Sequence, residues 1–174
     1  MYLNYIKNYF VKNKLRNSKL NSKTEISLEK VKTIGLIIDE TNFSNTNDLI
    51  KRLVLDGFSN NDIKVIVYKD KIDKKQQYNN YTFGYNVLHW NGKIRDINLN
   101  EFIQTEFDLL ISYYDTEKPL LLLITNNSKS KFKVGFSSND SILNHLIINT
   151  SVKNHDVFFY ELNKYLKILN KIEF

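Results

Sequence analysis

The sequence has 174 residues, of which 42% are hydrophobic and 25% charged, and its formal net charge is +6. This composition is typical of one soluble globular domain, and the absence of cysteine excludes disulfides, iron–sulfur clusters and thiol catalysis. No stretch approaches the ~18 apolar residues of a transmembrane helix. The start, interrupted by Lys7, does not resemble a signal peptide, so we expect a cytoplasmic protein.

The first 23 residues are purely cationic. They carry no carboxylate and six basic side chains, namely Lys7, Lys12, Lys14, Arg16, Lys19 and Lys23. The whole chain has 25 basic and 19 acidic residues, so the rest of it holds 19 of each sign and balances to zero. This uneven placement, rather than the lysine-rich composition, indicates an anionic partner.

If this segment is helical, it is amphipathic. Positions 12, 16, 19 and 23 then share one basic face. Aromatic and aliphatic residues form a second line, namely Tyr2, Leu3, Tyr5, Ile6, Tyr9 and Phe10. Such a segment can neutralise phosphates, stack rings on bases or lie on an anionic membrane surface. The plain alternative is a solvated tail whose first turns dock on the domain.

The next segment predicts a β–α–β unit. Residues 33–39 (TIGLIID) are a β-branched run typical of a strand, and residues 44–56 then space their apolar side chains as a helix does. Gly57 is placed to end that helix, and residues 63–68 (IKVIVY) indicate a second strand. We therefore expect a parallel pair with a helical crossover.

The middle of the chain is less regular. Residues 69–85 form a polar, aromatic connection that is longer than most loops, which favours a functional or mobile segment. Asn91-Gly92 predicts a hairpin with a type I′ turn, because both residue types accept positive φ. A short helix at 99–104 and a strand at 107–113 are expected to follow.

The last third alternates again. Pro119 indicates a helix start, so we expect a helix at 120–125, a strand at 132–136, and helices near 141–148 and over 156–172. This alternation predicts an α/β fold, a single Rossmann-like three-layer domain with a mainly parallel sheet. We assign residues 31–174 to that domain and residues 1–30 to a basic, aromatic amino-terminal arm.

Carboxylates follow the three longest expected strands. Because the carboxyl ends of parallel strands meet at one edge, Asp39, Asp70 and Asp115 could together hold Mg²⁺. We favour the plainer interpretation that these acids cap helices and turns. No glycine-rich phosphate loop and no catalytic triad can be assembled, so we expect neither a catalytic residue nor a cofactor.

A second basic cluster comprises Lys129, Lys131 and Lys133, which alternate around the start of the strand expected at 132–136. These lysines could meet phosphates. Exposed lysines at a strand edge also discourage aggregation, and for this cluster alone we favour that solvated interpretation.

Five stretches carry a resemblance: TIGLIIDETNF, TFGYNVLHWNGKIRD, FDLLISYYDTEKPLLLLIT, SKSKFKVGFSS and YLKILNKI. They resemble an uncharacterised family of small single-domain proteins of Bacteroidota, over most of the chain from about Thr33 onwards, and this resemblance implies no catalytic residues. A basic-armed protein of this size also resembles the lineage-restricted proteins of the large ribosomal subunit. FDLLISYY, followed by a helix and FKVGF, is similar to the amino-terminal half of heptosyltransferase-type glycosyltransferases.

We therefore expect a non-enzymatic RNA-binding protein, associated with the ribosome or part of its large subunit, and anchored to ribosomal RNA by the arm. The residues expected to contact RNA are Tyr5, Lys7, Tyr9, Lys12, Lys14, Arg16, Lys19, Lys23, Lys129, Lys131 and Lys133. The alternative is a nucleotide-sugar or phosphate-handling α/β enzyme that uses Asp39, Asp70 and Asp115. Contact of the arm with a membrane surface is the third hypothesis.

Overall fold

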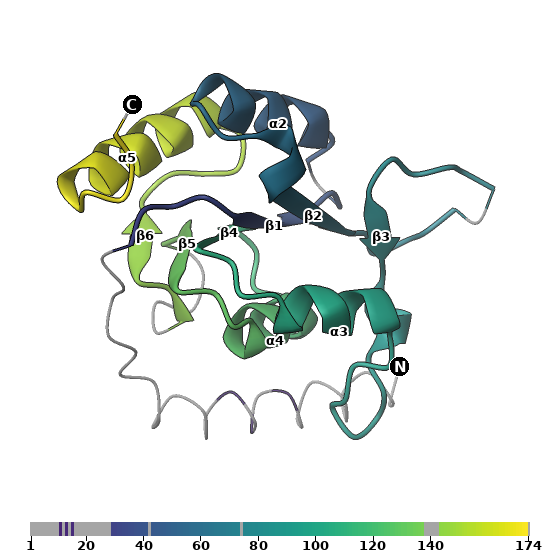
Figure 1. The fold of residues 1–174 in the computed structure, drawn as a ribbon. Helices are drawn as coiled ribbons and strands as arrows, with labels where there is room; N and C mark the ends of the chain where they lie inside the picture. Colours follow the sequence, from purple (N-terminus) through teal and green to yellow (C-terminus); the bar gives the residue numbers. More distant parts are fainter. Residues whose placement is uncertain are drawn as a thin grey trace.

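The computed structural model describes residues 11, 13, 15, 29–41, 43–73, 75–137 and 143–173. At its centre is a six-stranded sheet in the order β3-β2-β1-β4-β5-β6, in which every neighbouring pair is parallel. Helices cover both faces of this sheet (Figure 1). The predicted Rossmann-like, three-layer α/β fold is thus confirmed.

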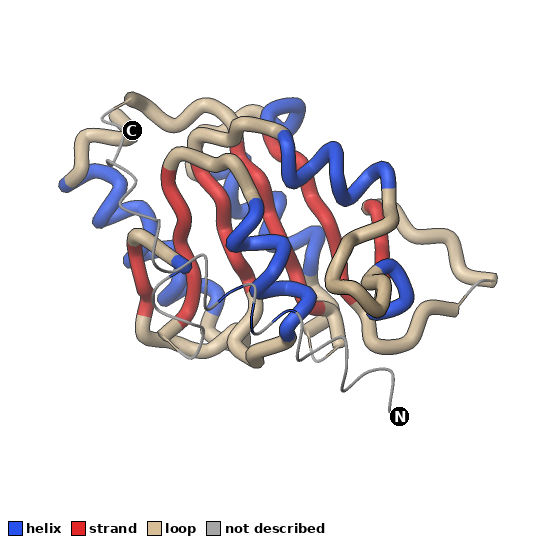
Figure 2. Tube along the Cα trace, turned by 90° about the horizontal axis from the view of Figure 1, so that it is seen from below, coloured by secondary structure: helices blue, strands red, loops and turns tan. Residues whose placement is uncertain are grey.

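The strands are β1 (Ile34–Asp39), β2 (Ile63–Tyr68), β3 (Tyr81–Phe83), β4 (Leu109–Tyr113), β5 (Phe132–Phe136) and β6 (Leu146–Ile148). Figure 2 shows them side by side, seen from below. All residues of β1 and β4 are buried, since these two central strands are covered on both faces. Strands buried on both sides form nearly unbroken apolar runs, which is why the sequence indicated them clearly.

The helices divide between the two faces. In Figure 1, α2 (Thr46–Leu55) and α5 (His155–Ile168) lie above the sheet, while α3 (Ile97–Gln104) and α4 (Pro119–Asn127) lie below it. Each pair of helices encloses its own hydrophobic core against the sheet. Gly35 of β1 faces the α3 side, where a Cβ atom would lie only 2.6 Å from the Phe107 ring. Glycine is needed at that position because the ring fills the space.

Two short strands were not predicted. β6 replaces the end of the helix expected near 141–148, because Leu146–Ile148 pair in parallel with β5 as an edge strand. β3 lies inside the connection expected over 69–85. Residues 69–80 therefore form the crossover between parallel strands β2 and β3, and a dozen residues is close to the minimum for such a crossover.

One turn and one helix end differ from their predictions. The prediction of a type I′ turn at Asn91-Gly92 is wrong, because Gly92 has positive φ (74°) and Asn91 does not. The Gly92 N–H donates to the His89 carbonyl at 3.0 Å, so the bend uses a three-residue arrangement with glycine after the turn. α5 ends at Ile168 because Asn170 adopts a left-handed conformation (φ 53°) and the Lys171 N–H donates back to Leu166 at 2.8 Å.

Candidate functional site

The strand order reverses between β1 and β4, and in open α/β sheets the crevice beyond the carboxyl ends at such a point is the usual ligand site. Here the crevice holds Lys118, the residue that precedes α4. Its Nζ lies 2.8 Å from Asp39 Oδ2 and 3.0 Å from Asp70 Oδ1, and it donates to Thr41 Oγ1 at 2.8 Å. The side chains of Lys118 and Asp39 are only 17% and 7% exposed. This ion-pair cluster therefore places side chains of the protein itself at the carboxyl ends of β1 and β2.

Tyr68, the last residue of β2, completes the cluster. Its hydroxyl donates to Asp70 Oδ1 at 2.7 Å, and Lys118 Nζ lies 4.5 Å from its ring centre. Burial, followed by the hydrogen bond to Asp70, raises the pKa of Tyr68. Burial acts to raise the pKa of Asp70, but the hydrogen bonds from Tyr68 and Lys118 outweigh it and lower that pKa overall. Both shifts keep Tyr68 protonated and Asp70 charged near neutral pH.

Asp115, the third candidate metal ligand, lies outside this cluster and binds a backbone N–H group instead. Its Oδ2 accepts the Val152 N–H at 3.1 Å, and the Tyr113 hydroxyl donates to the Val152 carbonyl at 2.8 Å. These contacts fix the segment that leads into α5. Within the described part of the chain, no three His, Asp or Glu side chains lie close enough together to hold a metal ion. Asp39 and Asp70 share an ammonium group instead, and Asp115 supports the backbone.

The second basic cluster is mostly engaged within the domain. Lys133 Nζ donates to the carbonyls of Thr125 at 2.7 Å and Asn126 at 3.3 Å, in the last turn of α4, and burial lowers its pKa to about 8. Lys131 Nζ lies 3.0 Å from Asp108 Oδ1 and also pairs with Glu29. Lys129 is exposed. Of these three predicted RNA contacts, only Lys129 is exposed and without such a partner among the described residues.

Two described residues of the arm pack into the domain. Val11 and Leu15 are 0% and 5% exposed and belong to the hydrophobic core on the α3 and α4 side of the sheet, whereas Asn13 is exposed. Val11 and Leu15 thus face the domain, whereas Asn13 faces solvent. The arm residues predicted to contact RNA lie outside the described residues, namely Tyr5, Lys7, Tyr9, Lys12, Lys14, Arg16, Lys19 and Lys23.

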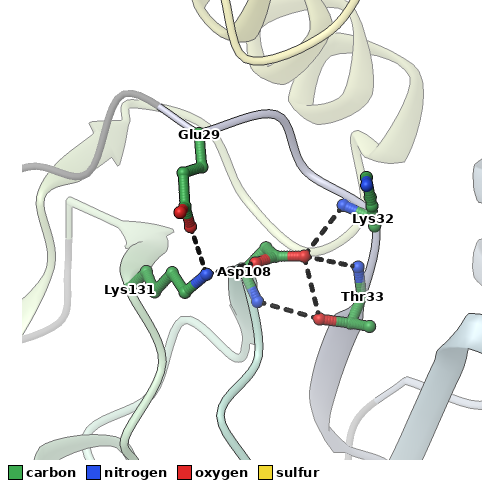
Figure 3. A network of polar contacts seen from close by, with 5 residues as sticks. All are labelled: Glu29, Lys32, Thr33, Asp108 and Lys131. Carbon is green, nitrogen blue, oxygen red and sulfur yellow. Dashed lines mark hydrogen bonds and ion pairs between the residues drawn. The ribbon is translucent and has the colours of Figure 1, made fainter.

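The segment that joins the arm to β1 is held by Asp108 (Figure 3). Asp108 Oδ2 accepts the backbone N–H groups of Lys32 and Thr33, each at 3.0 Å, and the Thr33 hydroxyl at 3.1 Å. The Asp108 N–H in turn donates to Thr33 Oγ1 at 3.0 Å. Burial acts to raise the pKa of Asp108, but the hydrogen bonds from Thr33, Lys131 and Lys32 lower it overall. We call this network the arm clasp; it consists of Glu29, Lys32, Thr33, Asp108 and Lys131.

A model of one protein family matches residues 4–169. The chain belongs to the family of unknown function DUF6913. The match begins within the basic amino-terminal stretch and includes nearly all of the α/β domain. Comparisons with curated proteins and with solved structures gave no match. Among the described residues of this DUF6913 protein, no helix is long and apolar enough to cross a membrane.

Sequence reasoning identified the acids of the DUF6913 crevice but not their partners. Lys118 is one of 22 lysines, and its place directly before the Pro119 helix start was the available signal, since that position lies at the carboxyl edge of the sheet. Tyr68 was taken only as the end of a strand. The crevice cluster depends on contacts between residues up to 79 positions apart, from Asp39 to Lys118, which spacing along the chain does not reveal.

Proposed function

We propose that this protein is a non-enzymatic RNA-binding protein that binds ribosomal RNA of the large subunit through its basic arm. The observation that carries this proposal is the separation of charge. Residues 1–23 contain six basic groups and no acid, while the rest of the chain holds equal numbers of both signs. Neutralisation of phosphates with release of counterions is the main source of affinity in such a segment.

The charges of the domain support the same conclusion, because many of them are already paired. Lys118 pairs with Asp39 and Asp70, Lys69 lies 3.1 Å from Glu40, and Lys131 pairs with Asp108. A lysine that is paired with a carboxylate attracts a polyanion less than a free one does. A polyanion would therefore find its strongest attraction at the arm.

The packing of Val11 and Leu15 adds a physical advantage to the arm. Two buried anchors restrain the segment before it binds, and restraint of the free state reduces the entropy lost on association. The aromatic residues Tyr5 and Tyr9 would add stacking on unpaired bases to the phosphate contacts.

The test is co-sedimentation of the full-length chain with ribosomes over a range of salt concentrations. If all six basic groups of the arm contact phosphates, log K should fall with log salt with a slope of roughly 4 to 5. Replacing these six residues with glutamine should abolish co-sedimentation. The matched control replaces six exposed lysines of the domain with glutamine, namely Lys51, Lys71, Lys75, Lys93, Lys153 and Lys167.

The control variant should bind as the wild-type protein does. Equal sedimentation of the arm variant and the wild-type protein, or no sedimentation of either, would reject RNA binding by the arm. Flotation with anionic vesicles, measured in parallel, distinguishes a membrane-surface role for the arm, because only that role predicts loss of flotation in the six-glutamine variant.

A second candidate is a nucleotide-sugar or phosphate-handling enzyme, and the strand order favours it. The order 3-2-1-4-5-6 is that of dinucleotide-binding folds, and Asp39 and Lys118 lie at its reversal point. Thermal stabilisation of the protein by nucleotides, nucleotide sugars or Mg²⁺ would support this candidate, since ligands that bind only the folded state raise the melting temperature. No stabilisation across that panel would reject it.

A further inference from the structure

A polar hollow lies beside the crevice cluster, at the carboxyl ends of β1 and β2 and next to the start of β3. We call it the amide hollow, and its lining residues are Glu40, Ser44, Thr46, Asn47, Val67, Lys69, Gln76, Gln77, Tyr78, Asn79, Asn80 and Thr82. Half of them belong to residues 69–80, the connection between β2 and β3 that projects at the right of Figure 1. Apart from Val67, every lining residue is polar or charged.

The size of the hollow restricts its ligand. Its volume is about 150 Å³, well below the roughly 300–1,000 Å³ of pockets that enclose drug-sized molecules. A whole dinucleotide or nucleotide sugar is too large for it. A single planar ring system, or one sugar unit, is of suitable size.

The charges of the hollow cancel. Lys69 Nζ lies 3.1 Å from Glu40 Oε2, and the Thr46 hydroxyl donates to the other carboxylate oxygen of Glu40. Among the described residues, the hollow has no other charged lining residue. A phosphate group gains little there because the single ammonium group is already compensated. The hollow therefore suits an uncharged ligand that forms many hydrogen bonds.

Five side-chain amides supply those hydrogen bonds, namely Asn47, Gln76, Gln77, Asn79 and Asn80. Within the described part of the chain, none of these amide groups is engaged with another residue. Each amide presents an acceptor beside two donors. This pattern complements the edge of a nucleobase, on which donors and acceptors also lie side by side.

Tyr78 adds an aromatic surface whose position is fixed. Its hydroxyl accepts the Asp73 N–H at 3.0 Å, and Lys69 Nζ lies 5.3 Å from the ring centre. A ring held in place loses little freedom when a base stacks on it. Stacking on aromatic side chains, combined with hydrogen bonds to base edges, is how proteins recognise unpaired bases in RNA.

We propose that the amide hollow binds one unpaired nucleobase of an RNA. This inference rests on the proposed RNA-binding function and deepens it. The arm would supply affinity that is independent of sequence, and the hollow would supply discrimination between bases, since phosphate contacts position a protein while base contacts give specificity.

The first test titrates the full-length protein with the four ribonucleosides and follows backbone amide signals by NMR. Shifts should cluster at residues 76–80, and one nucleoside should bind at least about fivefold more tightly than the weakest, the lower end of what one bidentate amide–base contact provides. The double variant Gln77→Ala with Asn79→Ala, and separately Tyr78→Leu, should each weaken that binding about tenfold or more. Gln104→Ala, which removes an exposed amide outside the hollow, is the matched control and should have no effect.

Folding of each variant is checked by its melting temperature, and the two independent variants separate loss of the site from loss of structure. Nucleoside shifts that fall elsewhere, that are equal for all four nucleosides, or that persist in both variants would overturn the proposal. Tighter binding of monosaccharides such as glucose than of any nucleoside would also overturn it.

The second test separates this proposal from the function of the arm. The binding of each variant to RNA homopolymers is measured over a range of salt concentrations. The variants of the amide hollow should lose base preference and keep the slope of log K against log salt. The six-glutamine arm variant should lose that slope. Nucleoside binding without RNA binding would leave the base site standing and reject the arm proposal. RNA binding without any base preference would support the arm proposal and reject the base site.

Discussion

Replacement of Asp108 with asparagine tests the arm clasp. The carboxylate is only 14% exposed, and it accepts two backbone N–H groups, from Lys32 and Thr33, besides its ion pair with Lys131. Asparagine is nearly isosteric but uncharged. It turns two charge-assisted hydrogen bonds into neutral ones, at a loss of about 1 kcal/mol each, and removes an ion pair worth about 0.2–1 kcal/mol. We expect Asp108→Asn to lower the free energy of unfolding by about 2–3 kcal/mol at neutral pH.

The pH dependence gives a sharper check of the same substitution. The pKa of Asp108 is lower in the folded protein than its ordinary value, so this side chain stabilises the fold above that ordinary value. The stabilisation is lost as the pH falls through the lowered, folded-state pKa. The difference between the wild-type protein and Asp108→Asn should therefore be largest at neutral pH and shrink below about pH 4.

Urea unfolding followed by circular dichroism, at neutral pH and at about pH 3, measures both quantities. The control is Asp62→Asn, because Asp62 is exposed just before β2 and its carboxylate has no partner among the described residues. A difference below about 0.5 kcal/mol at neutral pH, or one that is the same at both pH values, would refute the assignment of Asp108 as the anchor of the clasp.

Three further predictions concern a buried residue of the arm, the ion pair of Lys118 and the buried Lys133. Leu15→Ala should lower the free energy of unfolding by about 2–5 kcal/mol in urea titrations, because this side chain is 5% exposed, whereas Asn13→Ala, at an exposed position, should have little effect. Lys118→Met should lower the free energy of unfolding by about 1.5–3 kcal/mol, and adding Asp39→Asn should recover part of that loss. A double-mutant cycle that shows no coupling between the two substitutions would contradict the crevice ion pair. The pKa of Lys133 is lowered to about 8 by burial, so the unfolded chain binds more protons between about pH 8 and 10 and stability should rise with pH there. Lys133→Met should reduce that rise, as measured by unfolding free energies at several pH values.

The central strands could be predicted because their residues satisfy local and global preferences at once. IGLIID and IKVIVY are β-branched, and β1 and β2 occur where those runs occur. The start of α4 at Pro119 also followed from a local rule. β3 and β6 could not be predicted because three residues contain too little periodicity, and these strands form only by pairing with a neighbour already in place.

The candidate sites follow the same division. The positions of Asp39 and Asp70 after strands were visible in the sequence, because the carboxyl end of a strand is a local feature. The capture of both by Lys118, and the use of Lys133 to hold the end of α4, depend on tertiary packing. Spacing alone placed Lys129, Lys131 and Lys133 in one group, whereas the structure gives two of them partners within the domain.

The packing of Val11 and Leu15 has a consequence for the order of synthesis. Eight of the seventeen other buried members of their hydrophobic core come from α3 and α4, which begin and end roughly 80 to 110 residues later in the chain. Because synthesis proceeds at about 5–20 residues per second, these helices are made roughly 4–22 s after the two side chains. During that interval Val11 and Leu15 lack the part of their hydrophobic core that α3 and α4 supply. The order of synthesis thus exposes these two side chains before the domain can bury them.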